Sequence, residues 1–337
     1  MKKQKKFYPT EFWLSPKIFT SITKLLLTIR ELLYRFSTLS NHNRLAQIKR
    51  KQRSDFDLLV KQFPIYYKNL RTLNITKYVT GLWSNYNRNL ENIFLPYPTF
   101  SFLRNPVIMF TMFATAGGDQ LKKEIAYVER NMPQKKLKKL LEEDFIGNPL
   151  ILNQKYLTSH NTVDHAYHIA RFEEETNLDI SAFGHIVEWG GGYGNMAKIF
   201  RRLNPSVTYV VIDTPLFNCL QWLYLSTIFG PESVHFIQRV TDHVVPHKIN
   251  ILPLFFLEQY KGTPDLFLST WALCESSKFS QQYVADRQWF GARHLFLSYQ
   301  QSDVRLPDAD NVGRLASKDK AMIVPVGLLP DNYYAFR

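Results

Sequence analysis

The sequence is poor in cysteine and has no long apolar run, and both absences limit what the chain can be. Its 337 residues include two cysteines, Cys219 and Cys274, too few for a disulfide framework, which favours a reducing, cytoplasmic location. No uninterrupted apolar stretch reaches the length of about 18 residues that a membrane-spanning helix needs. The basic start has no clean apolar stretch followed by a small-residue cleavage site, so a secretory signal is not expected.

Acidic residues are scarce in the first half of the chain. Residues 1–150 hold 26 Lys and Arg against 11 Asp and Glu, a net charge of +15, whereas residues 151–337 hold 16 against 18, a net charge of −2. A basic surface of this kind is either simply solvated or meets nucleic acid, anionic lipid or an acidic glycan. The segment Ile18–Phe36 has apolar residues at helical spacing, so it is expected to pack on the body of the protein or to lie on a membrane surface.

The chain divides into a helical front part and a back part in which short apolar strands alternate with helices. Residues 54–150 read as mostly helical, with breaks at Pro96, Pro98 and Pro106. Strands are predicted at His185–Trp189, Thr208–Ile212, Asp265–Ser269 and His294–Tyr299, with a terminal strand pair at Ala321–Val326 and Tyr333–Arg337. Helices are predicted at Asn195–Leu203, Asp213–Gly230 and Ser280–Phe290.

The pattern leaves the third main strand undecided and makes the helix after the first strand amphipathic. Either Val234–Ile237 or Ile249–Leu252 forms the third main strand. In the helix that begins at Asn195, apolar side chains share one face and the basic residues Lys198, Arg201 and Arg202 are expected elsewhere. Alternating strands and helices predict an α/β fold with an open, mostly parallel sheet. Residues 151–337 would form this domain, and residues 1–150 a basic, mostly helical cap.

Glycines are concentrated in VEWGGGYGNMAKIF, where the first strand turns into a helix. Gly190, Gly191, Gly192 and Gly194 allow a sharp bend and a close approach of a ligand to the backbone. The helix that starts at Asn195 has free N–H groups at its first turn, and these favour an anionic group of a cofactor.

Two cofactor patterns compete for this loop. In the dinucleotide pattern, Asn195 would occupy a position that normally holds glycine or alanine. The alternative pattern, an acid followed by three alternating glycines, is complete from Glu188 to Gly194. Glu188 ends an apolar strand, so its burial requires a cation or hydrogen-bond donors, and the amino group of S-adenosylmethionine (SAM) would provide a cation. Asp213 ends the second strand, beside Thr214, where an acid can accept hydrogen bonds from both ribose hydroxyls.

The stretches VEWGGGYGNMAKIF and TYVVIDTP resemble class I SAM-dependent methyltransferases. Three further stretches, YHIARFEEETN, KINILP and DLFLSTWALCE, resemble a family of sugar O-methyltransferases, and the resemblance covers about residues 155–300. It implies a Rossmann-like, mostly parallel sheet with an antiparallel terminal strand and SAM as the cofactor. The cofactor-binding residues would be Glu188, Gly190, Gly191, Gly192, Gly194, Asn195, Asp213, Thr214 and Trp271.

Candidate acceptor-side residues follow the fourth strand. Glu275 would accept the proton of the acceptor hydroxyl or hold a neighbouring hydroxyl, and Trp271 would stack on a sugar or on adenine. His165 and His168 share a helix face before the glycine loop and are candidates for a base or metal ligands. Asp242-His243 is a further candidate base or metal element. A divalent metal is compatible with these residues, but no spacing demands one.

These features favour a cytoplasmic SAM-dependent O-methyltransferase acting on a sugar or glycan precursor. The precursor would be lipid-linked or acidic, and the basic cap would contact the inner membrane face. Nucleic acid is a less favoured substrate, because no Pro-Pro-aromatic turn follows the fourth strand and neither cysteine follows a proline. O-methylation of RNA or of another small molecule, a non-catalytic methyltransferase-like binding module and a dehydrogenase remain the alternatives.

Overall fold

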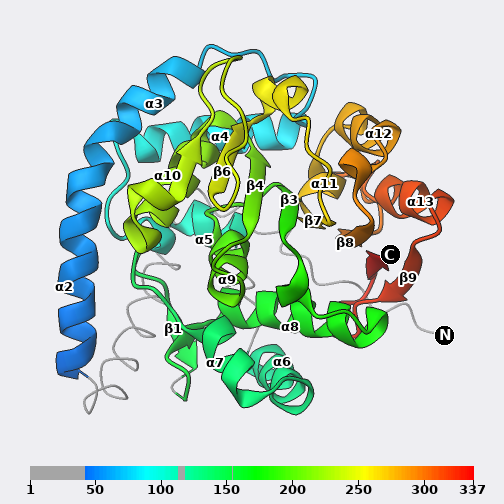
Figure 1. Cartoon of the computed structure of the whole chain (residues 1–337), viewed down its shortest axis with the longest axis horizontal. Helices are drawn as coiled ribbons and strands as arrows, with labels where there is room; N and C mark the ends of the chain where they lie inside the picture. The colour runs from blue at the N-terminus through cyan, green and yellow to red at the C-terminus, as the bar shows by residue number, and fades with distance from the viewer. Residues whose placement is uncertain (1–41, 113–117, 154) are drawn as a thin grey trace.

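The computed structural model describes residues 42–112, 118–153 and 155–337 (Figure 1). The expected helix Ile18–Phe36 lies outside the described residues. In the described part of the chain, every helix is too short or too polar to span a bilayer.

A twisted sheet of eight strands forms the centre of the described structure. Its strand order is β5-β6-β4-β3-β7-β8-β10-β9. Neighbours from β5 to β8 are parallel, and β10 is antiparallel to both β8 and β9. The fold class predicted from the sequence, a mostly parallel sheet with an antiparallel terminal strand, is therefore confirmed. The strands are β3 (His185–Trp189), β4 (Thr208–Asp213), β5 (Val234–Phe236), β6 (Ile249–Pro253), β7 (Leu266–Thr270), β8 (His294–Gln300), β9 (Met322–Pro325) and β10 (Asn332–Phe336).

The question of the third main strand has a clear answer in the sheet. Strand β6 pairs directly with β4, from Tyr209 opposite Ile249 to Asp213 opposite Pro253. Strand β5 pairs only with the outer side of β6 and so forms one edge of the sheet. All five residues of β6 are buried, as expected for a parallel strand that is covered on both faces.

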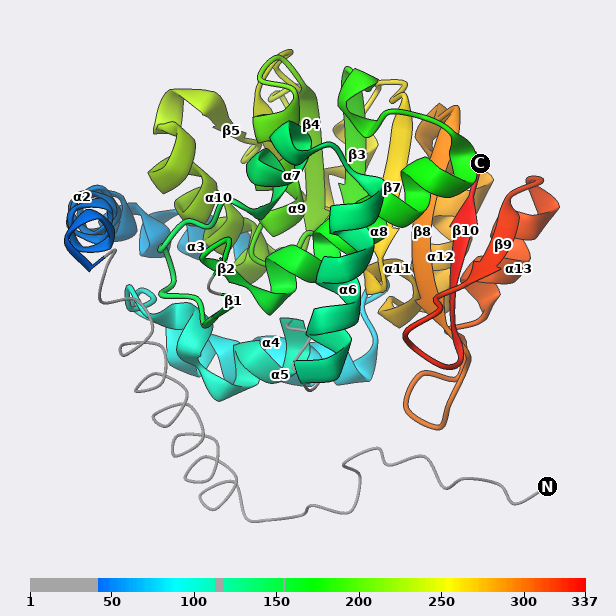
Figure 2. The same cartoon turned by 90° about the horizontal axis from the view of Figure 1, so that it is seen from below.

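Helices cover both faces of the sheet and form a layered α/β structure (Figures 1 and 2). The helices α8 (His160–Thr176), α9 (Asn195–Leu203) and α10 (Pro215–Phe229) lie on one face. The opposite face carries α12 (Lys278–Asp286) and α13 (Asn311–Lys318), with the short α11 (Ala272–Glu275) directly after β7. The predicted helix Ser280–Phe290 ends earlier than expected, because Gln288, Trp289 and Phe290 have positive φ angles.

The front part of the chain is helical, as predicted, and packs on the sheet domain. Its described helices are α2 (His42–Leu59), α3 (Phe63–Leu70), α4 (Gly81–Phe94), α5 (Pro106–Met112), α6 (Gly118–Asn131) and α7 (Gln134–Leu141), followed by a small sheet of β1 (Ile151–Asn153) and β2 (Thr158–Ser159). Pro106 begins a helix rather than breaking one, because its missing N–H costs nothing at that position.

One continuous hydrophobic cluster joins the two parts of the chain. It contains Phe63 of α3 and Leu90 of α4 together with Val187 of β3. Figure 2 shows α4 and α5 running across the end of the sheet at which β8 continues into the following loop, which is the carboxyl end of the parallel strands. The cap therefore lies over that end of the sheet. The division into two domains near residue 150 stays a prediction.

Lys198 of α9 belongs to a buried network of charged side chains. Its side chain is 0% exposed, and its Nζ lies 3.0 Å from Oε1 of Glu143, which is buried as well. Arg202, one turn further along α9, pairs with Asp144 at 2.7 Å. This network ties the chain after α7 to α9, the helix that follows the glycine loop. The partners lie 55 positions apart in the sequence, so helical spacing alone gave no sign of them.

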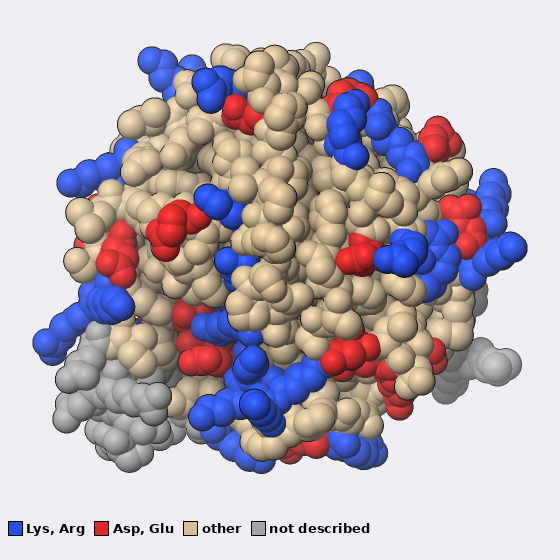
Figure 3. Space-filling view, in the orientation of Figure 1, with Lys and Arg blue, Asp and Glu red and all other residues tan. Residues whose placement is uncertain are grey.

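Three of the four lysines of α7 lie on the outside of the molecule, whereas Lys136 pairs with Glu173 and Asp179. Lys135, Lys138 and Lys139 are exposed, whereas Leu137, Leu140 and Leu141 are buried. Figure 3 shows Lys and Arg side chains gathered on this part of the surface. The amphipathic pattern of KKLKKLL is therefore a solvated basic face over an apolar one, as the spacing indicates.

Candidate active site

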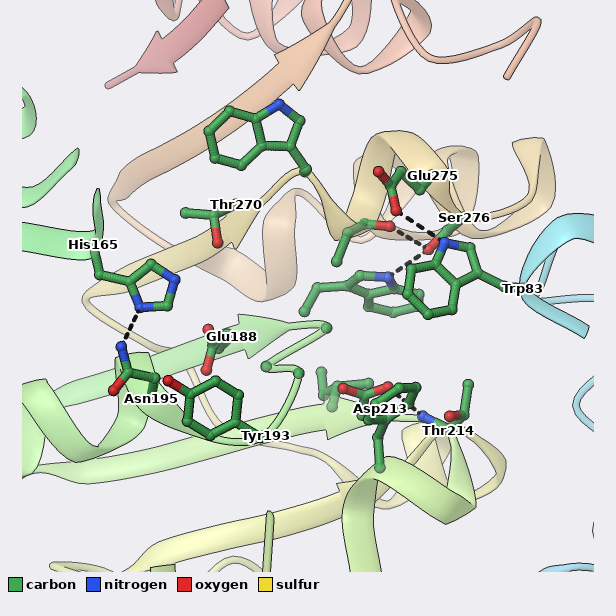
Figure 4. A pocket seen from close by; sticks show the side chains of 18 of the residues that line it. Trp83, His165, Glu188, Tyr193, Asn195, Asp213, Thr214, Thr270, Glu275 and Ser276 are labelled. Carbon is green, nitrogen blue, oxygen red and sulfur yellow. Dashed lines mark hydrogen bonds between the residues drawn. The ribbon is translucent and has the colours of Figure 1, made fainter. Parts of the chain in front are cut away.

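A pocket of about 650 Å³ lies at the carboxyl ends of β3, β4 and β7 (Figure 4). A volume of this size can hold a nucleoside cofactor or a drug-sized ligand. Its walls come from the glycine loop, the turns after β4 and β7, the first half of α8 and the cap helix α4. The position agrees with the rule that ligands of open parallel sheets bind beyond the carboxyl ends of the strands.

The glycine loop has the backbone conformation that its composition suggests. Gly190, Gly192 and Gly194 have φ angles of +75°, +55° and +100°, which side-chain-bearing residues rarely adopt. A Cβ at Gly190 would lie 2.0 Å from the Cβ of Ala272, so this glycine also lets α11 approach the loop. Gly194 precedes α9 and does not line the pocket, whereas Gly190, Gly191 and Gly192 do.

Glu188 lines the pocket with a carboxyl group that is almost completely buried. The residue is 2% exposed, and its Oε2 accepts a hydrogen bond from the Tyr209 hydroxyl at 2.9 Å. Burial raises the pKa of Glu188 to about 8, the Tyr209 hydrogen bond opposes this rise, and the nearby charge of Asp213 adds to it. Among the described residues no cation pairs with this carboxylate.

Asp213 lies at the end of β4 on the other side of the glycine loop. Its Oδ1 accepts a hydrogen bond from the Thr214 N–H at 2.7 Å, and its Oδ2 accepts one from Nε2 of Gln221 at 2.8 Å. The same Gln221 nitrogen donates to the carbonyl of Gly192 at 2.9 Å, so this side chain joins the acid to the loop. Burial raises the pKa of Asp213 to about 7, against the effect of these donors. Asp213 and Glu188 line the same pocket.

Trp271 begins the turn after β7 with a strained backbone. Its φ and ψ angles are 62° and −34°, a combination that costs roughly 1–3 kcal/mol and is concentrated at functional sites. The indole N–H donates to Oδ1 of Asn332 at 2.8 Å, and the ring lies 4.9 Å from the ring of His168. Trp271 lines the pocket and packs against His168, and its role in binding stays a prediction.

Glu275 ends α11 and also lines the pocket. Its Oε2 accepts a hydrogen bond from the indole N–H of Trp83 at 2.9 Å (Figure 4). Burial raises the pKa of Glu275 to about 7, whereas Trp83 and the charge of Arg305 lower it. A carboxyl group with a pKa near neutrality, placed in a pocket, has the properties of a general base.

His165 lies in the pocket wall, on α8, and faces Asn195 (Figure 4). The amide nitrogen of Asn195 lies 2.9 Å from Nδ1 of His165, while the amide oxygen of Asn195 faces the Thr162 hydroxyl at 3.4 Å. With the amide nitrogen as donor, the neutral imidazole carries its proton on Nε2. Burial lowers the pKa of His165 to about 4. His165 is therefore suited to donate a hydrogen bond from Nε2 rather than to accept a proton there.

Two of the predicted catalytic histidines do not lie in the pocket wall. His168 is 0% exposed, and its ring nitrogens contact the Tyr334 hydroxyl at 2.5 Å and Asp164 at 3.0 Å. Both ring nitrogens therefore already have partners within the protein. The ring packs against Trp271, so His168 supports the pocket wall from behind that residue. His243 is exposed on the loop after β5 and does not line the pocket. Neither His168 nor His243 is among the residues that line the pocket, and their catalytic roles stay predictions.

Several residues in the pocket wall or in contact with it were not found from the sequence. Trp83 comes from the cap and lies 192 positions from Glu275, so no local pattern links the two. Gln221 of α10 does not line the pocket itself but donates to Asp213, which does, and its spacing from Asp213 was the only available signal. Asp164 lines the pocket beside His165 while its carboxylate binds His168. Tyr193 of the glycine loop lines it too, and its hydroxyl accepts from Asn161 at 3.0 Å.

The described residues contain no group of three or more His, Cys, Asp or Glu side chains that could hold a metal ion. The predicted site residues that line the pocket are Glu188, Gly190, Gly191, Gly192, Asn195, Asp213, Thr214, Trp271, Glu275 and His165. Chemically, this set offers a buried and a half-buried acid beside a bent loop, a neutral imidazole donor and a carboxyl group whose pKa is near 7.

Comparison with known proteins gives only distant structural similarities. No family model matches the chain, and no curated protein matches it significantly. Similar solved structures include StiE O-MT residues 942-1257 (13% identity, 46% of this chain, TM-score 0.32). Human N-acetylserotonin methyltransferase in complex with SAM has 12% identity over 73% of each chain and a TM-score of 0.35. The mitomycin 7-O-methyltransferase MmcR has 12% identity over 90% of this chain and 98% of its own, with a TM-score of 0.35.

The alignment with StiE O-MT spans about half of that chain, 51%. Similarities at these identities and TM-scores do not specify an activity, so the function is inferred below from the site itself.

Proposed function

We propose that this chain is a SAM-dependent O-methyltransferase that acts on a hydroxyl group of a sugar or glycan precursor. The observation that carries the proposal is the pocket that Glu188, Asp213 and Glu275 share. Glu188 and Asp213 flank the glycine loop, and Glu275 enters the same pocket from the turn after β7.

The fit of SAM to this pocket follows from the two acids beside the loop. Glu188 is a buried acid without a cation among the described residues, and the amino group of the cofactor would supply one. Asp213 keeps acceptor capacity, because each carboxylate oxygen can accept two hydrogen bonds and would take them from ribose hydroxyls. The Nε2–H of His165 would donate to an anionic group, such as the cofactor carboxylate, from the opposite wall.

Methyl transfer requires alignment and removal of one proton. SAM supplies a sulfonium methyl group, which an acceptor oxygen takes in an in-line displacement while the C–S electron pair returns to sulfur. Within the chain, Glu275 would accept the hydroxyl proton, since a base with a pKa near 7 is matched to neutral pH. The indole rings of Trp83 and Trp271 would offer apolar faces to a sugar.

Calorimetry with S-adenosylhomocysteine (SAH), and with NAD in parallel, tests the cofactor assignment. We expect SAH to bind with a dissociation constant in the micromolar range and NAD to bind at least tenfold more weakly. Tighter binding of NAD would favour a dehydrogenase and refute the proposal. A Gly192→Val variant is expected to lose SAH binding while keeping a cooperative thermal transition, because valine is strained at a φ of +55° and would distort the loop that lines the pocket.

Methyl transfer itself is tested by release of SAH from SAM in the presence of nucleotide sugars, lipid-linked saccharides and, as a rival, RNA. Turnover with a saccharide supports the proposal, and turnover with RNA alone contradicts it. A Glu275→Gln variant is expected to bind SAH normally and to lose at least about 100-fold in turnover, the usual contribution of a general base. A chain that binds SAH but methylates nothing in the panel would point to a binding module instead.

Two further parts of the proposal concern location. We place the enzyme in the cytoplasm. We also place the basic cap in contact with an anionic membrane face, because exposed lysines such as Lys135, Lys138 and Lys139 would attract anionic lipid. Sedimentation with vesicles of phosphatidylserine and phosphatidylcholine at low salt tests the contact. Recovery of the whole chain in the supernatant would remove the membrane part and leave the cofactor assignment intact.

A further inference from the structure

The cap is hydrogen-bonded to the chain that follows β7 over a short, continuous segment. The Tyr78 carbonyl accepts hydrogen bonds from the Ser277 N–H at 3.2 Å and the Ser280 hydroxyl at 2.7 Å. The Thr80 hydroxyl, which also caps α4, donates to the carbonyl of Glu275 at 3.2 Å. These contacts hold the start of α4 against the turn that carries Glu275.

Helix α4 is also attached to the turn after β4. The Thr214 hydroxyl donates to Oδ1 of Asn87 at 3.3 Å, and the rings of Trp83 and Phe217 lie 6.0 Å apart in an edge-to-face arrangement. The first half of the helix therefore bridges the ends of two strands that form the pocket, and it is held against the turns that follow both strands.

Trp83 lies in the first turn of this bridging helix and contacts Glu275 directly. Its Nε1 donates to Oε2 at 2.9 Å, and an indole N–H can only donate. Such a bond favours the charged carboxylate and fixes one of its two oxygens. The described residues provide no hydrogen bond to the other oxygen, Oε1, and Glu275 lines the pocket.

We propose that Trp83 is a positioning residue, which holds Oε2 of Glu275 and leaves Oε1 directed to a proton of the acceptor, so that the cap completes the catalytic site. The inference rests on the proposed function for the role of Glu275 as a base. The Trp83–Glu275 pair itself is a feature of the folded chain and can be tested without cofactor or acceptor.

The other titratable groups around Glu275 are few and can be named. Arg305 and Asp303, on the loop after β8, act on it in opposite directions and form an ion pair with each other at 3.5 Å. Tyr86 of α4 and the buried Cys274 of α11 also interact electrostatically with Glu275. Burial raises the pKa values of both groups above their ordinary ranges, so neither titrates near neutral pH. Asp213 and Glu188 line the same pocket, and their pKa values are raised to about 7 and about 8, so a transition near pH 7 is assigned to Glu275 by its loss in Glu275→Gln.

Fluorine NMR of the full chain labelled with 5-fluorotryptophan tests the pair. The chain has six tryptophans, and the Trp83 resonance is the one missing from a Trp83→Phe variant. We expect this resonance to shift with a midpoint near pH 7 and to lose that transition in Glu275→Gln. A Trp83 resonance that is unchanged between pH 5 and 9, or that still titrates in Glu275→Gln, would overturn the proposal.

A second measurement follows the carboxyl group itself. In protein labelled with 13C at the glutamate carboxyl carbon, the Glu275 signal is identified by its loss in Glu275→Gln. Trp83→Phe keeps an aromatic ring but removes the donor, so we expect the midpoint of Glu275 to rise by about one pH unit. Trp189→Phe is the matched control, because its indole N–H donates to the neutral hydroxyl of Ser276 in the same pocket, at 2.9 Å. An equal shift in both variants would assign the effect to general loosening of the pocket and refute the positioning role.

Failure of this inference and failure of the proposed function give different results. If the Trp83 resonance does not titrate while SAH still binds, the positioning role is wrong and the cofactor assignment stands. If SAH does not bind while the Trp83 resonance titrates with Glu275, the proposed function is wrong, but the hydrogen bond between Trp83 and Glu275 is supported. With an acceptor in hand, Trp83→Phe should move the acidic limb of the pH–rate profile upward by the same amount as the NMR midpoint.

Discussion

The phenol oxygen of Tyr209 lies 2.9 Å from Oε2 of Glu188, inside the sheet domain and beneath the glycine loop. A neutral hydroxyl thus serves as the partner of a buried acid at the position where a cationic ligand group is proposed to bind. Because Tyr209 cannot neutralise the charge, Glu188 favours its protonated form in the empty protein, and its pKa is raised to about 8.

We predict that Glu188→Gln makes the empty protein less sensitive to alkaline pH. The folded state holds a proton on Glu188 up to about pH 8, whereas the unfolded chain releases it near the ordinary pKa of 4.5. The stabilising effect of this proton is complete below pH 4.5 and is lost as pH rises towards 8, with a slope of about 1.4 kcal/mol per pH unit. Asp213 and Glu275 contribute slopes of the same sign. Urea unfolding of both proteins at several pH values from 5 to 8.5 therefore measures the difference between them.

The same substitution is expected to weaken SAH binding by about 10- to 100-fold, the effect of losing a charged hydrogen-bond partner. Stability and affinity would then move in opposite directions at pH 8. A variant that loses both together would indicate that Glu188 supports the fold and has no role towards a cation.

Gln221 gives a second prediction, because its amide nitrogen donates to both Asp213 and the Gly192 carbonyl. Gln221→Met keeps the length of the side chain and removes both hydrogen bonds. We expect a loss of about 1–3 kcal/mol in the free energy of unfolding and roughly tenfold weaker SAH binding, since Asp213 loses a fixing donor. Gln281→Met is the control: Gln281 is equally buried and donates to two carbonyls, those of Cys274 and Ser276, but not to Asp213 or to the glycine loop. It should lose stability and keep its SAH affinity, as measured by calorimetry.

His165 is predicted to stay neutral throughout the physiological pH range. Its pKa is lowered to about 4, against an ordinary value of 6.5, because burial disfavours the imidazolium. Between these values the unfolded chain binds a proton that the folded chain does not, so this group lowers stability as pH falls from 6.5 towards 4. Histidine NMR, with His165 assigned through His165→Phe, should show no transition of its ring carbons above pH 5. A midpoint near 6.5 would contradict the assigned tautomer and restore His165 as a candidate base.

Local patterns predicted the sheet domain well, because its signals are local. The bounds of β3 and α9 agree with the prediction, since a continuous apolar strand, a glycine bend and an amphipathic helix each have a spacing of their own. Long-range pairs were not predictable in this way. Trp83 and Lys198 meet their partners only after the cap has packed on the sheet domain, and no periodic pattern records such a contact.

The buried pair of Lys198 and Glu143 gives a fourth prediction. Removing one partner leaves the other charge buried and unpaired, which typically costs about 3–5 kcal/mol. We therefore expect Lys198→Met and Glu143→Gln each to destabilise strongly, and the double variant to be less destabilised than the sum of the two. Urea unfolding of the four proteins forms a double-mutant cycle. Strict additivity of the two changes would show that the charges do not interact across their 3.0 Å separation.

Gly190 provides the last prediction, because the absence of a side chain there permits both the bend of the loop and the close packing of α11. An alanine there would place its Cβ 2.0 Å from the Cβ of Ala272 and would hold a φ of +75°. We expect Gly190→Ala to destabilise by about 2–5 kcal/mol, the combined cost of overpacking and backbone strain. Gly81→Ala is the control, because a Cβ at Gly81 meets no atom within 4 Å and lies in the first turn of α4, where it should stabilise slightly.

The two costs at Gly190 can be separated by a second substitution. Ala272→Gly in the Gly190→Ala background removes the overlapping methyl group but leaves the positive φ. We therefore expect partial recovery of the thermal midpoint, together with partial recovery of SAH binding, as the loop returns to its bend. Full recovery would show that the backbone angle carries no strain, and no recovery would show that the overlap with Ala272 is not what restricts this position.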